Sequence, residues 1–113
     1  MSFALTKKQI RDQTKTVTRR LKWKAIRVGD RIRPVEKCMG LKRGQVQRLV
    51  GQCDLIVVAV ARESLQEITQ ADVIAEGFPE MDREDFIAMF CKNMKTRPDV
   101  RVTRIAFQYV PRT

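Results

Sequence analysis

The sequence contains no histidine, so the side chain that most often serves as a catalytic base and metal ligand is missing. Its three cysteines, Cys38, Cys53 and Cys91, are far apart and form no C-x-x-C pair. A zinc site would therefore need an unusual set of ligands, and we expect no metal. No motif for a nucleotide cofactor is present either, so we expect no cofactor. The odd number of cysteines indicates reduced thiols, as in a cytoplasmic protein.

Long apolar segments are also missing. A membrane-spanning helix needs about 20 apolar residues, whereas the longest apolar run here is LIVVAVA, residues 55–61. The β-branched residues of this run predict a buried strand. The N-terminus has no apolar region of the signal-peptide kind, and no repeat or Pro/Gly-rich linker interrupts the chain. We therefore expect a single domain over residues 1–113 and no membrane partner.

Positive charge is abundant and unevenly placed. Residues 1–53 hold 15 Lys and Arg against three acidic residues, whereas residues 54–113 hold eight against ten. Such asymmetry favours a polyanionic partner, because each neutralised phosphate releases condensed counterions. The alternative is a basic surface that only maintains solubility. The most basic stretch is KTVTRRLKWK, residues 15–24, which also contains the chain's single tryptophan.

The pattern of apolar residues predicts an α+β, mainly β domain. Alternating β-branched residues predict strands in four segments: residues 15–23, 27–37, 53–65 and 100–110. Helical spacing and capping residues predict short helices in three others: residues 5–13, 68–78 and 81–94. Because these helices are few, they cannot cover both faces of a doubly wound sheet. We expect a partly closed β-barrel of about five strands with short flanking helices.

Several local features of these elements are also predicted. Thr6 is expected to cap the first helix, with Gln9 completing a capping box. Pro34 indicates an edge strand or a bulge, because proline donates no ladder hydrogen bond. In the second predicted helix, Val73 and Ile74 are expected to face inward, and this helix is expected to end at Gly77.

A series of short motifs then resembles the ASCH domain, most closely the small single-domain ASCH proteins of bacteria and their phages. The motifs are TKTVTRRL, a GD pair before a basic strand, VEKCMGLKRG, ITQADVIAEGFPEM, an F-x-x-x-F helix and VTRIAFQYV, and together they cover essentially the whole chain. The resemblance implies membership of the PUA-like superfamily, with a pseudo-barrel of about five strands and a cleft beside the first helices. It also implies nucleic-acid binding, with RNA favoured over DNA because PUA relatives bind RNA.

The resemblance further implies two possible enzyme activities. Some ASCH proteins are reported as ribonucleases, and one small bacterial branch is an amidohydrolase that removes acyl groups from N-acetylated cytidine. The catalytic lysine and threonine of that branch lie in a K-T-x-T string, and its glutamate lies near the short central helix. This pattern falls on Lys15, Thr18 and Glu76. The basic stretch CMGLKRGQVQR is an insertion that the compact amidohydrolases lack, and it makes the rim of the cleft more cationic.

The proposed trio has two chemical readings. A threonine hydroxyl needs a base. Lys15 is a neutral base if burial and the charges of Arg19 and Arg20 lower its pKa enough, and a cationic clamp for an oxyanion if Glu76 keeps it protonated. In the second case Glu76 carries the proton. Residues three apart in a straight strand face opposite sides, so Lys15 and Thr18 converge only if the chain bends between them. The alternative is a solvated lysine followed by strand-forming threonines.

The basic side chains around this trio are predicted contacts for phosphate groups, and Trp23 is predicted either to stack on a base or to belong to the core or its rim. The predicted nucleic-acid contacts are Lys15, Arg19, Arg20, Lys22, Trp23, Lys24, Lys42, Arg43 and Arg48. Three functions follow as alternatives: a module that binds nucleic acid or a nucleoside, a hydrolase that uses the trio, and a phage-encoded inhibitor of a host protein.

Overall fold

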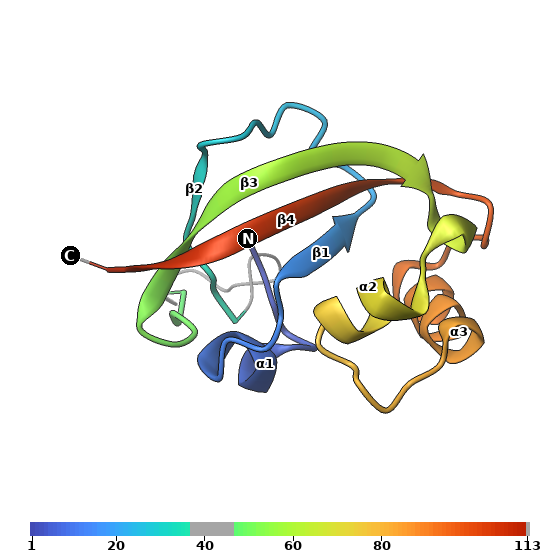
Figure 1. The fold of residues 1–113 in the computed structure, drawn as a ribbon, viewed down its shortest axis with the longest axis horizontal. Helices are drawn as coiled ribbons and strands as arrows, with labels where there is room; N and C mark the ends of the chain where they lie inside the picture. Colours follow the sequence, from blue (N-terminus) through green and yellow to red (C-terminus); the bar gives the residue numbers. More distant parts are fainter. Residues whose placement is uncertain (37–46, 113) are drawn as a thin grey trace.

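The computed structural model describes residues 1–36 and 47–112, and its strands form one curved antiparallel sheet in the order β1-β4-β3-β2 (Figure 1). The strands are β1 (Val17–Arg20), β2 (Arg31–Ile32), β3 (Cys53–Ser64) and β4 (Arg101–Pro111). This half-barrel with a few short helices confirms the predicted fold class, a mainly β α+β domain, with four strands among the described residues where about five were predicted. The loop predicted over residues 38–45 lies outside the described residues.

The long pair of β3 and β4 forms the centre of the sheet. Its register runs from Cys53 opposite Pro111 to Ser64 opposite Arg101, with a bulge between Val57 and Ala59. A bulge increases the local bend and twist of a strand. The short β2 forms one edge of the sheet, as Pro34 predicts.

In the part of the chain that the structure describes, four short helical elements flank the sheet: α1 (Lys7–Arg11), the 3₁₀ helix η1 (Leu65–Glu67), α2 (Gln70–Ala75) and α3 (Arg83–Met94). The predicted cap of α2 is present, since the Thr69 side chain accepts a hydrogen bond from the Asp72 amide at 3.1 Å. Gly77 follows α2 with φ +105°, in the left-handed region that glycine adopts readily.

Two predictions about the helices are wrong. The Thr6 side chain makes no capping hydrogen bond to α1, and Gln9 does not complete a capping box. Gln9 Nε2 instead donates to the carbonyl of Gly77 at 3.1 Å, which ties α1 to the end of α2. Ile74 is 48% exposed, because the six residues of α2 turn Val73 to the core and leave its neighbour facing out.

The buried side chains form two clusters along the sheet. The first lies among the N-terminal segment, α1 and the middle of the sheet: Phe3, Ile10, Ile32, Val50, Leu55, Val57, Ile105 and Phe107. The second lies among η1, α2, α3 and the start of β4: Leu65, Ile68, Val73, Phe86, Phe90 and Val102. Among the described residues, no helix has the length and apolar character that a membrane span requires.

Candidate functional site

A cavity of about 230 Å³ lies where the two clusters meet, because its wall includes Phe3 of the first and Phe86 and Phe90 of the second. The polar residues that line it are Ser2, Thr6, Lys15, Thr18, Arg19, Arg20, Glu76 and Asn93. Most of its large apolar wall comes from α3 and the segment before it: Phe78, Phe86, Met89, Phe90 and Met94. The cavity therefore joins one polar side to one aromatic and thioether side.

Lys15 and Glu76 form a buried ion pair in this cavity. Lys15 Nζ lies 2.8 Å from Glu76 Oε1 and also donates to the Glu76 carbonyl at 2.8 Å. Their side chains are 3% and 5% exposed. One backbone and one side-chain hydrogen bond place the pair: the Thr16 amide donates to the carbonyl of Ala75, and Tyr109 Oη donates to the carbonyl of Lys15 at 2.6 Å. The first residues of the basic stretch are thereby fixed against the end of α2.

Thr18 lines the same cavity, although it lies three residues after Lys15. The two converge because Lys15 precedes β1, so the alternation of side chains along a strand does not apply to it. Thr18 is 3% exposed, and its Oγ1 accepts a hydrogen bond from Arg20 Nε at 3.1 Å. The guanidinium of Arg20 also lies over the ring of Phe3, 4.8 Å from the centroid. The structure thus brings the predicted trio together.

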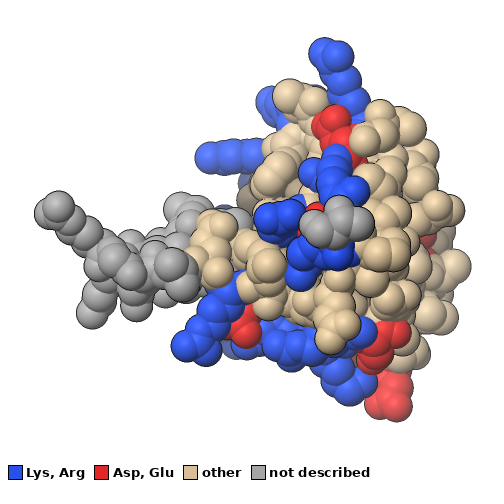
Figure 2. All heavy atoms as spheres, turned by 90° about the vertical axis from the view of Figure 1, so that its left-hand side faces the viewer, with Lys and Arg blue, Asp and Glu red and all other residues tan. Residues whose placement is uncertain are grey.

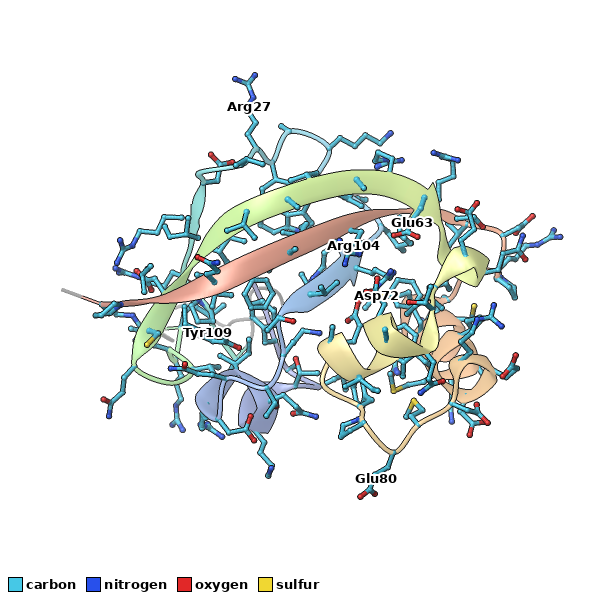
Figure 3. All side chains as sticks on the ribbon, viewed as in Figure 1. Arg27, Glu63, Asp72, Glu80, Arg104 and Tyr109 are labelled. Carbon is cyan, nitrogen blue, oxygen red and sulfur yellow. The ribbon has the colours of Figure 1, made fainter. Side chains whose placement is uncertain are left out.

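Arg19 belongs to an ionic network behind the cavity. Its guanidinium pairs with Glu76 at 3.1 Å, with Glu63 at 3.2 Å and with Asp72. Arg104, opposite Arg19 in the β1–β4 register, donates to the same Asp72 at 2.7 Å. Figure 3 shows Glu63, Asp72 and Arg104 gathered between the sheet and α2. With Lys15, three cations balance three carboxylates.

The network bears on two predicted phosphate contacts. Arg19 is 1% exposed and faces three carboxylates, so its charge is neutralised inside the protein. Lys15 is likewise buried against Glu76. Both charges are therefore offset by carboxylates, and a contact of either side chain with phosphate stays a prediction.

The network also sets the protonation of its members. Burial lowers the pKa of Lys15, while the charge and hydrogen bond of Glu76 oppose that shift. The hydrogen bond from Arg104, together with Arg19, outweighs burial and lowers the pKa of Asp72 to about 2. Lys15 is therefore the cation of the cavity whose proton is most easily removed.

The other predicted nucleic-acid contacts lie away from the cavity. Lys22, Trp23 and Lys24 are exposed on the segment that follows β1, and Trp23 is 44% exposed, so it is not a core residue. Arg48 is exposed near β2 and the N-terminal segment. The predictions for Lys42 and Arg43 lie outside the described residues.

Some residues of the site were not predicted. The sequence shows the spacing of Phe86, Phe90 and Met89 on one helix but does not reveal that they line a cavity. Arg104 was assigned only to a strand, and its pairing with Asp72 depends on the β1–β4 register. Within the described ranges, no three His, Cys, Asp or Glu side chains lie close enough together to hold a metal ion.

No family model and no curated protein matches this chain. Two solved structures are similar to it. A DUF984 protein from Enterococcus faecalis V583 is 14% identical with a TM-score of 0.65, over 93% of this chain and 69% of that one. An ASCH domain from Lactobacillus crispatus JV V101 is 15% identical with a TM-score of 0.60, over 96% of this chain and 72% of that one. At this identity the likeness shows the fold.

Proposed function

Because the chain has the ASCH fold, which suggests nucleic-acid binding in general, we propose that its cavity binds a single nucleobase or nucleoside. The observation that supports this proposal is the contrast between the two sides of the cavity. Lys15 and Thr18 lie on the polar side, and Phe78, Phe86 and Phe90 lie on the other. A base has the same contrast, since its faces are apolar and its edge is polar.

The hydrogen-bonding groups of the cavity match the edge of a pyrimidine. Glu76 accepts two hydrogen bonds from the Lys15 ammonium, and no other acceptor among the described residues takes its third hydrogen. The Thr18 hydroxyl accepts from Arg20, so its own hydrogen is left to donate. These two donors suit the carbonyl oxygen and ring nitrogen that cytosine presents. The volume of about 230 Å³ is smaller than most sites for drug-sized ligands and fits one base.

Calorimetric titration with cytidine tests this proposal. Thr18→Val removes the hydroxyl donor while keeping the shape, and we expect cytidine affinity to fall about tenfold, since a buried polar group left unpaired costs 1–3 kcal/mol. Thr16→Val is the matched control, because Thr16 is exposed on the same stretch and lines no part of the cavity. Equal affinities for the two variants contradict the proposal.

A second candidate function, hydrolysis of an N-acylated nucleoside, is supported by the convergence of Lys15, Thr18 and Glu76 in one cavity. Thr18 Oγ1 attacks the acyl carbon while its proton passes to Lys15, if Lys15 is neutral, or to Glu76. The nucleoside amine then leaves with that proton. Water cleaves the resulting ester, releasing the carboxylic acid and restoring Thr18. The guanidinium of Arg20, which donates to Oγ1, stabilises the alkoxide character that Thr18 gains as it loses its proton.

Incubation with N-acetylcytidine, followed by chromatography of the products, tests this second function. We expect cytidine and acetate from the wild-type protein and no turnover from Lys15→Ala or Thr18→Val. Thr16→Val is again the control and is expected to keep full turnover. A Lys15→Ala variant with full turnover rules out hydrolysis by this trio.

A further inference from the structure

A second group of charged residues lies at the opposite end of the sheet, around the buried carboxylate of Asp54. Asp54 Oδ2 accepts a hydrogen bond from Arg31 Nε at 2.9 Å, and Oδ1 accepts one from Arg112 Nε at 2.9 Å. Arg33 Nη2 lies 3.5 Å from Oδ2. Three guanidinium groups of the described residues therefore surround one carboxylate, and these four side chains together carry two positive charges in excess. Burial raises the pKa of Asp54, but hydrogen bonds from the arginines outweigh it and lower that pKa to about 2.

The three arginines have different roles in this cluster. Arg112 is 16% exposed and uses all its nitrogens inside the protein, since it also donates to the carbonyls of Gly51 and Cys53. Arg31 and Arg33 are 48% and 59% exposed. They are two residues apart along the chain at β2, a spacing that puts both side chains on one face. Asp54 thus holds two exposed guanidinium groups beside each other.

Figure 2 shows the end of the molecule where β3 begins and β4 ends, with Lys and Arg side chains gathered over it and few acidic ones. The segment between β1 and β2 rises from the sheet on the side away from α2 and α3 (Figure 1). Arg27, on that segment, points outward (Figure 3). This surface is therefore separate from the cavity of Lys15 and Glu76.

A hollow of about 360 Å³ adjoins the arginines, and Arg31 belongs to both features. Its lining is Trp23, Ala25, Ile26, Asp30, Arg31 and Ile32. Trp23 is 44% exposed and has φ +71°, a conformation that is a genuine outlier for a bulky side chain. Holding a residue there costs of order 1–3 kcal/mol, and such strain concentrates at functional positions.

Hydrogen bonds fix the segment that carries Trp23. The amide of Gly29 donates to the carbonyl of Val57 at 2.8 Å, and the amide of Val57 donates to the carbonyl of Asp30 at 2.9 Å. The carboxylate of Asp30 accepts from the amide of Arg27 at 2.9 Å. Among the described residues, Asp30 is the carboxylate that lines the hollow, and it is engaged with the backbone, so it does not occupy the space beside the indole.

We propose that Trp23, Arg31 and Arg33, which we name the Trp–Arg face, bind single-stranded nucleic acid, with Arg112 and Asp54 supporting the two exposed arginines from behind. Arg31 and Arg33 contact successive phosphates, and a base stacks on the indole of Trp23 in the hollow. Arginine forks match phosphate geometry, and stacking of a base on an aromatic side chain is worth about 1–3 kcal/mol. A duplex lacks unstacked bases, so a single strand fits this face better. An acidic protein segment would use the charges but not the exposed, strained indole.

The single tryptophan makes the test direct, because its fluorescence reports on this face alone. We expect a twelve-residue oligouridine to quench the Trp23 emission, with affinity that falls as salt rises. A duplex RNA of the same length and a polyglutamate peptide are expected to bind at least tenfold more weakly. Equal binding of the duplex or of polyglutamate, or no quenching by oligouridine, overturns the proposal.

Two variants with the same change of charge provide the control. Arg33→Ala removes an exposed guanidinium that lies 3.5 Å from Asp54, and we expect a loss of about tenfold in affinity with a salt dependence reduced by about one ion. Arg97→Ala removes an exposed arginine on the α3–β4 connection and is expected to change neither. Equal losses in both variants show a non-specific charge effect and contradict the proposal.

The test of the Trp–Arg face can be separated from the test of cytidine binding in the cavity. Thr18→Val is expected to weaken cytidine binding and to leave oligouridine binding unchanged, whereas Trp23→Ala is expected to do the reverse. Oligouridine binding to these variants is measured by calorimetric titration, because Trp23→Ala removes the only tryptophan. A loss of oligouridine binding in Thr18→Val refutes the assignment of the strand to the Trp–Arg face. Circular dichroism of each variant verifies that the fold is retained.

Discussion

Replacing Glu76 with glutamine tests the buried ion pair that defines the cavity. The change keeps the shape of the side chain and removes the negative charge that Lys15 and Arg19 contact at 2.8 and 3.1 Å. Arg19 keeps two carboxylates, Glu63 and Asp72. Lys15 loses its ion-pair partner while remaining 3% exposed. The destabilisation therefore arises mainly from the Lys15 ammonium.

The size of this destabilisation follows from the cost of an uncompensated buried charge. Removing one partner of a buried ion pair costs about 3–5 kcal/mol. Because Arg19 remains paired and Lys15 can lose its proton, we expect the lower end, about 3 kcal/mol near pH 7. For a domain of this size, that loss corresponds to a decrease in Tm of about 10 °C.

The effect also has a defined dependence on pH. Burial lowers the pKa of Lys15 below its ordinary value of 10.5, and Glu76 partly offsets this. Without Glu76 the folded-state pKa falls further. Between that pKa and the ordinary value, the unfolded chain binds more protons than the folded one, so the stability of Glu76→Gln rises with pH. The difference from the wild-type protein is therefore expected to shrink as the pH rises from 6 towards 9.

Urea denaturation at pH 6.0, 7.5 and 9.0 measures both the loss of stability in Glu76→Gln and its dependence on pH. Glu80→Gln is the control, because Glu80 is exposed on the α2–α3 connection and points away from the protein (Figure 3). We expect its free energy of unfolding to stay within about 0.5 kcal/mol of the wild-type value. A Glu76→Gln variant that matches this control at every pH refutes the reasoning.

Three further changes test the structure around the cavity. The depressed pKa of Asp72, about 2 against an ordinary 3.8, supplies stability that is complete above pH 4 and lost as the pH falls towards 2; urea titrations of Asp72→Asn are expected to lose that acid dependence. Gly77→Ala forces a Cβ to within 2.7 Å of Gln9 at φ +105°, so thermal denaturation is expected to show a loss of about 1–3 kcal/mol, and no loss contradicts the assigned conformation. Tyr109→Phe removes the hydrogen bond to the Lys15 carbonyl, and we expect about 1 kcal/mol lower stability and weaker cytidine binding; unchanged binding shows that this bond does not position Lys15.

The features that sequence reasoning predicted correctly depend on nearby residues. The cap formed by Thr69, the end of α2 at Gly77 and the long strand β3 each follow from local chemistry. Local patterns failed where a helix has little more than one turn. In α1 and α2, tertiary contacts decided that Gln9 bonds to Gly77 and that Ile74 faces out.

The candidate site depends on contacts between distant residues. Lys15 and Glu76 are 61 positions apart, and only the resemblance to a family, not a local pattern, placed them together. Arg19 was predicted to contact phosphate because it lies among many basic residues in the sequence. The number of basic residues in a stretch does not reveal which of their side chains pair with carboxylates. Its burial follows from the position of β1 beside α2 and β4, which no short stretch specifies.

The Trp–Arg face and the arginines around Asp54 were also not predicted from the sequence. Arg31 and Arg33 appeared as ordinary charges of an edge strand, and Arg112 lies near the other end of the chain. The antiparallel pairing of β2 with β3 and of β3 with β4 brings all three to Asp54. A concentration of positive charge in space therefore arose from residues that are separated in sequence.

The most direct test of the cavity is NMR of the protein with ¹³C-labelled methionine methyl groups during a cytidine titration. Met89 and Met94 line the cavity, whereas Met81 packs in the second cluster outside it. We predict saturable shifts of the Met89 and Met94 signals, no shift of Met81, and a tenfold weaker response in Thr18→Val. Unchanged Met89 and Met94 signals at millimolar cytidine, or an equal response in Thr18→Val, contradict the account.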